Sequence, residues 1–96
     1  MPLETGNCFI TVVDENRQAL PGAIASLTAG DAPRVEIADA QGQCKFWMLP
    51  PGVWALEVQM EGYCTINYPS IVINVGRDTS VEVTLSLAVI DVIVSE

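Results

Sequence analysis

Apolar residues recur at every second position along most of the chain, and this spacing predicts β-strands because alternate side chains of a strand share one face. In CFITVV the spacing places Cys8, Ile10 and Val12 together. The polar segment DENRQALPG, with its proline and glycine, then ends this first strand. A second strand is predicted over residues 23–29, AIASLTA, and a turn over residues 30–33.

The middle of the chain predicts two strands joined by a short turn. This turn is DAQG, in which Asp39 and Gly42 are typical turn residues. Alternation in the strand that follows places Lys45 and Trp47 on the outward face. It places three side chains on the opposite face, namely Cys44, Phe46 and Met48.

The stretch FWMLPPGVWALEV, residues 46–58, contains both tryptophans of the chain. Two prolines and a glycine in its middle predict a tight turn between two core strands rather than a ligand-binding loop. After the turn, Trp54, Leu56 and Val58 share one face, and we expect Leu49 and Trp54 to close the end of the core. Trp54 is therefore interpreted as scaffold.

The last part of the chain predicts a strand with Ile71 and Ile73, a turn at VGRD and a further strand. That strand carries Val81, Val83, Leu85 and Leu87 on one face. Short strands at this turn spacing are typical of an all-β fold, and we predict a seven-stranded antiparallel Greek-key sandwich.

The C-terminal residues break the alternation. Up to Leu87 one face is polar, whereas both faces are apolar in residues 88–94. A strand of this kind requires cover on both sides, and left free it is an aggregation hazard. We therefore predict an extra C-terminal strand that is covered by its own sandwich, by a second copy in a homodimer or by another protein. Its candidate contact residues are Ala88, Ile90, Val92 and Val94.

Length and charge limit the classes of partner. The 96 residues predict a single domain, and the formal net charge of -8 comes from twelve acidic and four scattered basic residues. Without gathered positive charge, binding to nucleic acid or to acidic lipid is disfavoured. The longest apolar stretch, LSLAVIDVIV, is too short and too polar to cross a bilayer. The N-terminus lacks the pattern of a secretory signal, so we expect a cytoplasmic chain or a module of a larger exported protein.

The reactive residue types argue against catalysis and against metal binding. The chain has no histidine, and Cys8, Cys44 and Cys64 are too widely spaced for the usual zinc motifs. Carboxylate pairs such as Asp14 with Glu15 fit a solvated turn better than an acid and base pair. Calcium could be held by oxygen atoms of DEN and DAQG, although neither segment has EF-hand spacing. We expect no catalytic residue, no metal and no cofactor.

Several motifs in a fixed order resemble the carboxypeptidase regulatory-like domain, a transthyretin-like family. These motifs are VVDENRQALPGAIASL, ADAQGQCKF, LPPGVWALEV, EGY and VGRDTSVEVTL, and they cover roughly residues 7–87. The chain departs from the family pattern at Arg17, where the turn glycine is usual, at Cys44, where an aromatic residue is usual, and at Trp54, where tyrosine is common.

The resemblance implies an accessory role without catalysis. Such domains accompany carboxypeptidases, surface and outer-membrane proteins and bacterial secretion spikes, including those of type VI secretion, where they assist folding, spacing or docking. The resemblance thus favours an assembly or docking module, with a spike extension that recruits an effector as one version. It leaves a purely structural spacer open as an alternative.

The outward aromatic residues provide the sharpest candidate for a contact site. Phe9 and Trp47 lie on the outward phase of their strands and could form an exposed apolar patch of the kind that marks interfaces or sugar platforms. The alternative is that the tail strand or the loop ends cover them, which we favour for Phe9 and leave open for Trp47. A sugar site combines such platforms with polar groups, and Trp47 has only Lys45 and Gln43 on its strand face. We therefore predict protein docking, with carbohydrate binding as the alternative.

Overall fold

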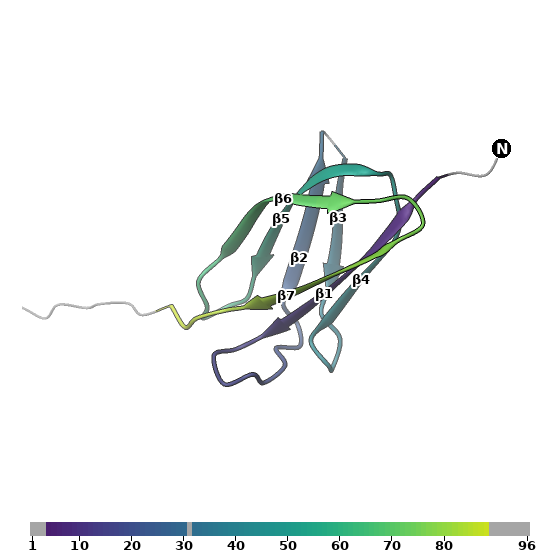
Figure 1. Cartoon of the computed structure of the whole chain (residues 1–96). Coiled ribbons are helices and arrows are strands. Elements are labelled where there is room, and N and C mark those ends of the chain that lie inside the picture. The colour runs from purple at the N-terminus through teal and green to yellow at the C-terminus, as the bar shows by residue number, and fades with distance from the viewer. Residues whose placement is uncertain (1–3, 31, 89–96) are drawn as a thin grey trace, which may run out of the picture.

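The computed structural model describes residues 4–30 and 32–88, which form two β-sheets packed face to face (Figure 1). One sheet has the strand order β4-β1-β7 and the other has the order β3-β2-β5-β6. The described residues contain no helix, and hence none long and apolar enough to cross a membrane. The seven strands are β1 (Gly6–Val13), β2 (Ile24–Ala29), β3 (Ala32–Ile37), β4 (Gln43–Leu49), β5 (Gly52–Gln59), β6 (Ile66–Ile73) and β7 (Asp78–Thr84). The predicted all-β sandwich of seven strands is confirmed.

The first and last strands are parallel neighbours, which corrects the prediction of a wholly antiparallel sandwich. β1 pairs with β7 from Asn7 opposite Asp78 to Val13 opposite Thr84. The other four strand pairs are antiparallel. A tight hairpin imposes an antiparallel pair, whereas β1 and β7 are joined through all the intervening strands. Alternation along the sequence therefore carries no information about their relative direction.

The core lies between the sheets and follows the predicted alternation closely. From β1 it receives Cys8, Ile10 and Val12, which are all fully buried. The opposite sheet contributes the predicted face of β5 and the two isoleucines of β6, namely Trp54, Leu56, Val58, Ile71 and Ile73. No charged or polar side chain is buried among the described residues. Period-two patterning thus identified most of the core.

An irregularity in β4 overturns the prediction for Met48. The pairing of β4 with β1 shifts register between Gly6 and Cys8, and Met48 has a positive φ of 56°. Its side chain is 68% exposed, while Leu49 takes the buried position instead. The Met48 amide donates to Asn7 Oδ1 at 3.0 Å. An extra residue in one strand of a pair displaces the following side chains, which simple alternation does not anticipate.

Two other boundaries differ from the predictions. The turn at residues 30–33 is shorter, because Pro33 belongs to β3 and pairs with Thr28. Proline is tolerated there since β3 is an edge strand. At the other end β7 stops at Thr84, and Leu87, predicted to be inward, is 59% exposed.

The chain after β7 returns toward the loop that joins β5 to β6. Leu87 forms an isolated antiparallel bridge with Tyr63, and the Ala88 amide donates to the Gly62 carbonyl at 3.0 Å. Of the predicted C-terminal strand, only exposed Ala88 belongs to the described residues. Ile90, Val92 and Val94 lie outside them.

Candidate docking surfaces

The two predicted outward aromatic residues are in contact on the outer face of the three-stranded sheet. Phe9 extends from β1 and Trp47 from β4, with ring centroids 5.1 Å apart and an interplanar angle of 74°. This edge-to-face geometry is favourable for aromatic pairs. Trp47 is 53% exposed and Phe9 is partly buried. Their predicted outward orientation is confirmed, and their role in partner binding remains a prediction.

Polar groups near this aromatic pair are largely engaged within the domain. Asn7 donates from Nδ2 to Asp78 Oδ1 at 3.0 Å, and its Oδ1 accepts from the Met48 amide. The carbonyl of Trp47 accepts a hydrogen bond from Arg34 Nη2 at 3.0 Å. Lys45, which pairs with Phe9, remains exposed. The patch thus offers a small aromatic surface with few free polar partners.

A second apolar surface, which the sequence reasoning missed, lies on the outer face of the four-stranded sheet. We call it the aliphatic face, and it consists of Ile24, Val35, Ile37, Val53 and Val72. These side chains are between 40% and 64% exposed. Of the residues with the same outward phase in the described parts of this sheet, Glu57 carries the one charge. The outward phase also carries the polar residues Ser26, Thr28 and Asn67, so this sheet face is almost uncharged and only partly apolar.

Strand register explains why the aliphatic face points outward. Ile24 pairs with Ile37 and Ser26 pairs with Val35, so these four residues share one face. The opposite face of β2 carries Ala25 and Leu27, which are fully buried in the core. In antiparallel pairs, directly opposed residues project to the same side of the sheet. Because Ala25 and Leu27 point into the core, Ile24 and Ser26 and the β3 residues opposite them point outward.

Alternation in the β3 sequence would by itself place Val35 and Ile37 inside, because they alternate with Arg34 and Glu36. The structure reverses this expectation, since the two charged residues take the inward phase at the open edge of the sandwich and stay exposed there. Arg34 reaches the β4 carbonyl of Trp47, and the Glu36 carbonyl lies 3.8 Å from Cys44 Sγ. Only the partnership of β3 with β2 and β4 reveals this arrangement.

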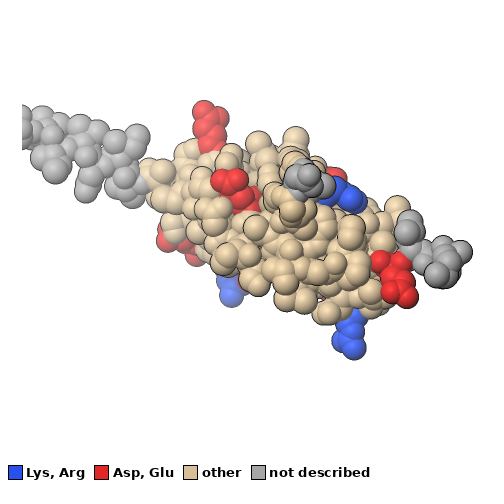
Figure 2. Space-filling view, turned by 90° about the horizontal axis from the view of Figure 1, so that it is seen from above, with Lys and Arg blue, Asp and Glu red and all other residues tan. Residues whose placement is uncertain are grey.

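Charged side chains lie mainly at the margins of the molecule in the view from above. Figure 2 shows a broad uncharged surface with most acidic and basic residues at its margins and an acidic group within it. On the three-stranded sheet, charges occur at Lys45, Asp78 and Glu82, each exposed. The two sheets therefore present outer faces of different character, one mixed and one almost uncharged.

An open hollow borders the aliphatic face at Ile24. It measures about 620 Å³ and is lined by Ile24, Gln59, Met60, Gly62 and Tyr63, among others. Its one charged lining residue is Glu61. This lining supplies neither an acid and base pair nor a nucleophile with its base, so it gives no basis for a reaction.

The carboxylates considered for calcium binding support turns. Asp14 Oδ1 accepts from the amides of Asn16 and Gln18 at 2.8 and 2.9 Å. Asp39 Oδ1 accepts from the amides of Gln41 and Gln43 at 2.9 and 3.0 Å. These bonds to the backbone hold the pKa of Asp39 below its ordinary value, chiefly through Gln43. Over residues 4–30 and 32–88, no group of three or more potential ligands is gathered for a metal.

The cysteines differ in accessibility. Cys8 and Cys44 are buried, and burial raises the pKa of each thiol to about 11. Both therefore stay protonated near neutral pH and behave as small apolar residues. Cys64 is exposed in the loop between β5 and β6. All three are free thiols, and neither buried residue is available as a nucleophile.

Comparison with known proteins identifies the fold and the family. The sequence profile of the carboxypeptidase regulatory-like domain matches residues 9–86. No curated protein sequence matches the chain.

Similar solved structures include the Bacillus anthracis TIE protein, with a TM-score of 0.79 and 17% identity over 88% of this chain and 17% of that one. The minor pilin GBS52 of Streptococcus agalactiae has a TM-score of 0.73 and 15% identity over 98% of this chain and 49% of the pilin. 3-Chlorocatechol 1,2-dioxygenase from Rhodococcus opacus has a TM-score of 0.72 and 12% identity over 91% of this chain and 61% of the enzyme.

At these identities the likeness concerns the fold alone. The chain spans less than two thirds of each of these proteins. Since a pilin and an enzyme contain similar folds, the fold does not specify the role of this domain.

Proposed function

Because the chain belongs to the carboxypeptidase regulatory-like domain family, we propose that it is a noncatalytic module that docks another protein. The aliphatic face carries this proposal. Ile37 and Val35 are 64% and 54% exposed on a sheet face with little charge, and apolar surface of this kind is favourable to bury against a partner. A protein partner with a flat apolar surface fits this face.

The aromatic pair of Phe9 and Trp47 is proposed as a second contact on the opposite outer face. A docking surface needs one aromatic anchor with a polar rim, which Trp47 and exposed Lys45 provide. Binding of sugars through the same pair remains the alternative. It receives less support because Asn7 and the Trp47 carbonyl are already bonded within the domain.

The predicted C-terminal contacts of residues 88–94 remain part of the proposal. Exposed Ala88 emerges beside Gly62, which lines the hollow next to Ile24. A partner seated at the Ile24 end of the aliphatic face would therefore lie close to Ala88. We propose that the domain acts within a larger exported protein, where it recruits a partner such as an effector. A spacer without partners is the other reading.

Substitution of the aliphatic face tests the main proposal. The double variant Val35→Thr, Ile37→Thr removes apolar contact from exposed positions, so the fold should tolerate it. Val75→Thr, which changes a 46% exposed valine in the turn before β7, is the matched control. We expect the double variant to weaken capture of the partner from the source cells by about tenfold or more, equivalent to ~1.4 kcal/mol. Equal capture of the partner by the parent, the double variant and the Val75→Thr control would refute docking through this face.

Titration with oligosaccharides tests the alternative. Tryptophan fluorescence reports on exposed Trp47, whereas buried Trp54 is shielded from a bound ligand. A saturable change that disappears in Trp47→Phe would support sugar binding. A flat titration with intact partner capture would leave protein docking as the better explanation.

A further inference from the structure

The first and last strands of the described residues form one continuous parallel ladder. Seven residue pairs join β1 to β7, from Asn7 opposite Asp78 to Val13 opposite Thr84. The ladder extends at both ends, because the Asn7 amide donates to Arg77 at 3.0 Å and the Leu85 amide donates to Val13 at 2.9 Å. The first and last segments of the sandwich are thus bonded directly to each other.

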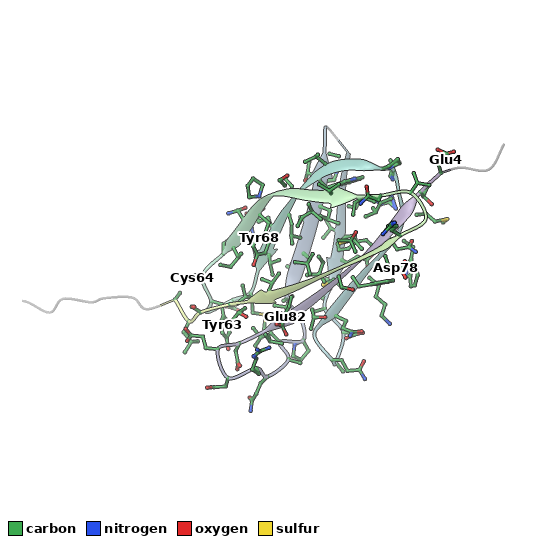
Figure 3. The ribbon with its side chains drawn as sticks, viewed as in Figure 1. Glu4, Tyr63, Cys64, Tyr68, Asp78 and Glu82 are labelled. Carbon is green, nitrogen blue, oxygen red and sulfur yellow. The ribbon has the colours of Figure 1, made fainter. Side chains whose placement is uncertain are left out.

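Parallel pairing of β1 and β7 determines at which ends the chain enters and leaves the sandwich. β1 and β7 start at the same end of the sheet, so the chain enters at the start of β1 and leaves at the far end of β7. Figure 3 shows this separation, with Glu4 at one end of the sandwich and Tyr63 and Cys64 near the exit at the other. An antiparallel pair of terminal strands would have placed entry and exit at the same end.

This path determines how the ladder responds to tension. Force applied to the two ends of the chain pulls β1 and β7 in opposite directions along their length, so the strands are loaded in shear. The ladder bonds lie across the pulling direction and share the load together. When two strands are instead pulled apart from one end, their bonds break one at a time at lower force.

The packing around β1 reinforces this geometry. β1 is the central strand of its sheet and pairs with β4 on its other edge. Its inward residues Cys8, Ile10 and Val12 are fully buried. For β1 to slide, it must break both ladders and expose this apolar surface, which is costly. The weaker element is the single bridge between Leu87 and Tyr63, which should yield first.

We propose that the domain is a tension-bearing link that transmits force between chain segments joined to its two ends, with the β1 and β7 ladder as its mechanical clamp. This function goes beyond docking and does not depend on a partner at the aliphatic face. It also sharpens the spacer alternative, since a spacer of this construction resists extension along its axis.

Single-molecule force spectroscopy on the full chain in two pulling directions provides the test. In the first, handles at the two termini load β1 against β7 in shear. In the second, handles at the N-terminus and at Val75→Cys load the end where both strands start, because the Gly76 amide bonds to Thr5 there. Cys64→Ser in both proteins removes the exposed thiol, and buried Cys8 and Cys44 do not compete for the handle.

We expect the unfolding force along the end-to-end direction to be several-fold higher than from the strand-start end. Equal forces in the two directions would overturn the proposal. Trp54→Phe in β5 is the matched control, because it lowers thermal stability without touching the ladder. Its end-to-end unfolding force should stay close to that of the parent. A force that instead fell in proportion to thermal stability would also overturn the clamp.

Discussion

The guanidinium of Arg17 lies 3.1 Å from the carboxylate of Glu82, and this ion pair joins the turn after β1 to β7. Arg17 has a φ of 68°, in the left-handed region that favours glycine. The glycine that is usual here in the family is explained by this backbone conformation. Since the side chains are 76% and 51% exposed, the ion pair offsets only part of the strain.

Arg17→Gly should therefore stabilise the domain. Relief of the left-handed strain outweighs the lost ion pair, and we expect a gain in unfolding free energy of about 0.5 to 1 kcal/mol. Arg17→Ala removes the same ion pair and keeps the unfavourable φ, so it should be slightly destabilising. Urea denaturation of the three proteins measures the difference. A loss of stability in Arg17→Gly that equals the loss in Arg17→Ala would show that the ion pair dominates.

Trp54 should contribute far more to stability than Trp47. Trp54 is 3% exposed and donates from Nε1 to the Pro50 carbonyl at 3.0 Å, which ties β5 to the turn before it. Trp54→Phe loses this bond and some core volume, at a cost of about 2 kcal/mol. Trp47→Phe, at a half-exposed position, should stay within ~0.5 kcal/mol of the parent. Calorimetry of both variants measures these losses of stability. An equal loss of unfolding free energy in the two variants would contradict the scaffold role of Trp54.

Asp39 should make the turn between β3 and β4 sensitive to acid. Its pKa is lowered in the folded state, mainly by the backbone amides of Gln43 and Gln41. The resulting stabilisation is present above the unfolded pKa of about 3.9 and is lost as pH falls through the lower folded pKa. Asp39→Ala should therefore melt below the parent at pH 7, and the gap should narrow in acid. Glu61→Gln, in an exposed loop, controls for the loss of one charge, and a pH-independent gap would argue against this linkage.

Thiol labelling should divide the cysteines into two classes. Exposed Cys64 should react with iodoacetamide in the folded protein, while Cys8 and Cys44 remain protected by burial and by their raised pKa of about 11. Intact mass should show a single adduct in native buffer and three in denaturant. Native adducts at Cys8 or Cys44 would mean that the sheets open readily on the labelling timescale.

Much of the fold was accessible from sequence because burial in a sandwich imposes a period of two. The inward faces of β1, β5 and β6 followed from alternation, and the order of turn motifs led to the family that the profile match establishes. The exposure of Met48 could not be predicted from alternation, because an extra residue in β4 shifts the phase of the side chains that follow it. The exposure of Leu87 could not be predicted either, because the apolar character of a residue does not show where a strand ends.

The candidate sites were accessible only in part. The outward aromatic residues Phe9 and Trp47 could be assigned from strand phase, although their 5.1 Å contact required the pairing of β1 with β4. The aliphatic face could not be assigned, because Val35 and Ile37 alternate with charged residues like an ordinary inward face. Their exposure follows from the registry of β3 on β2, which is a contact between strands.

Local sequence is sufficient to specify the strands, the turns and most of the core of this protein, since these depend on the periodicity and turn chemistry of neighbouring residues. Which strands are neighbours, and in which direction they run, depends on long-range packing. That choice turned Ile24, Val35 and Ile37 outward and set β1 parallel to β7. Side-chain phase is a local property, whereas the pairing of strands depends on how the whole chain closes around a shared core.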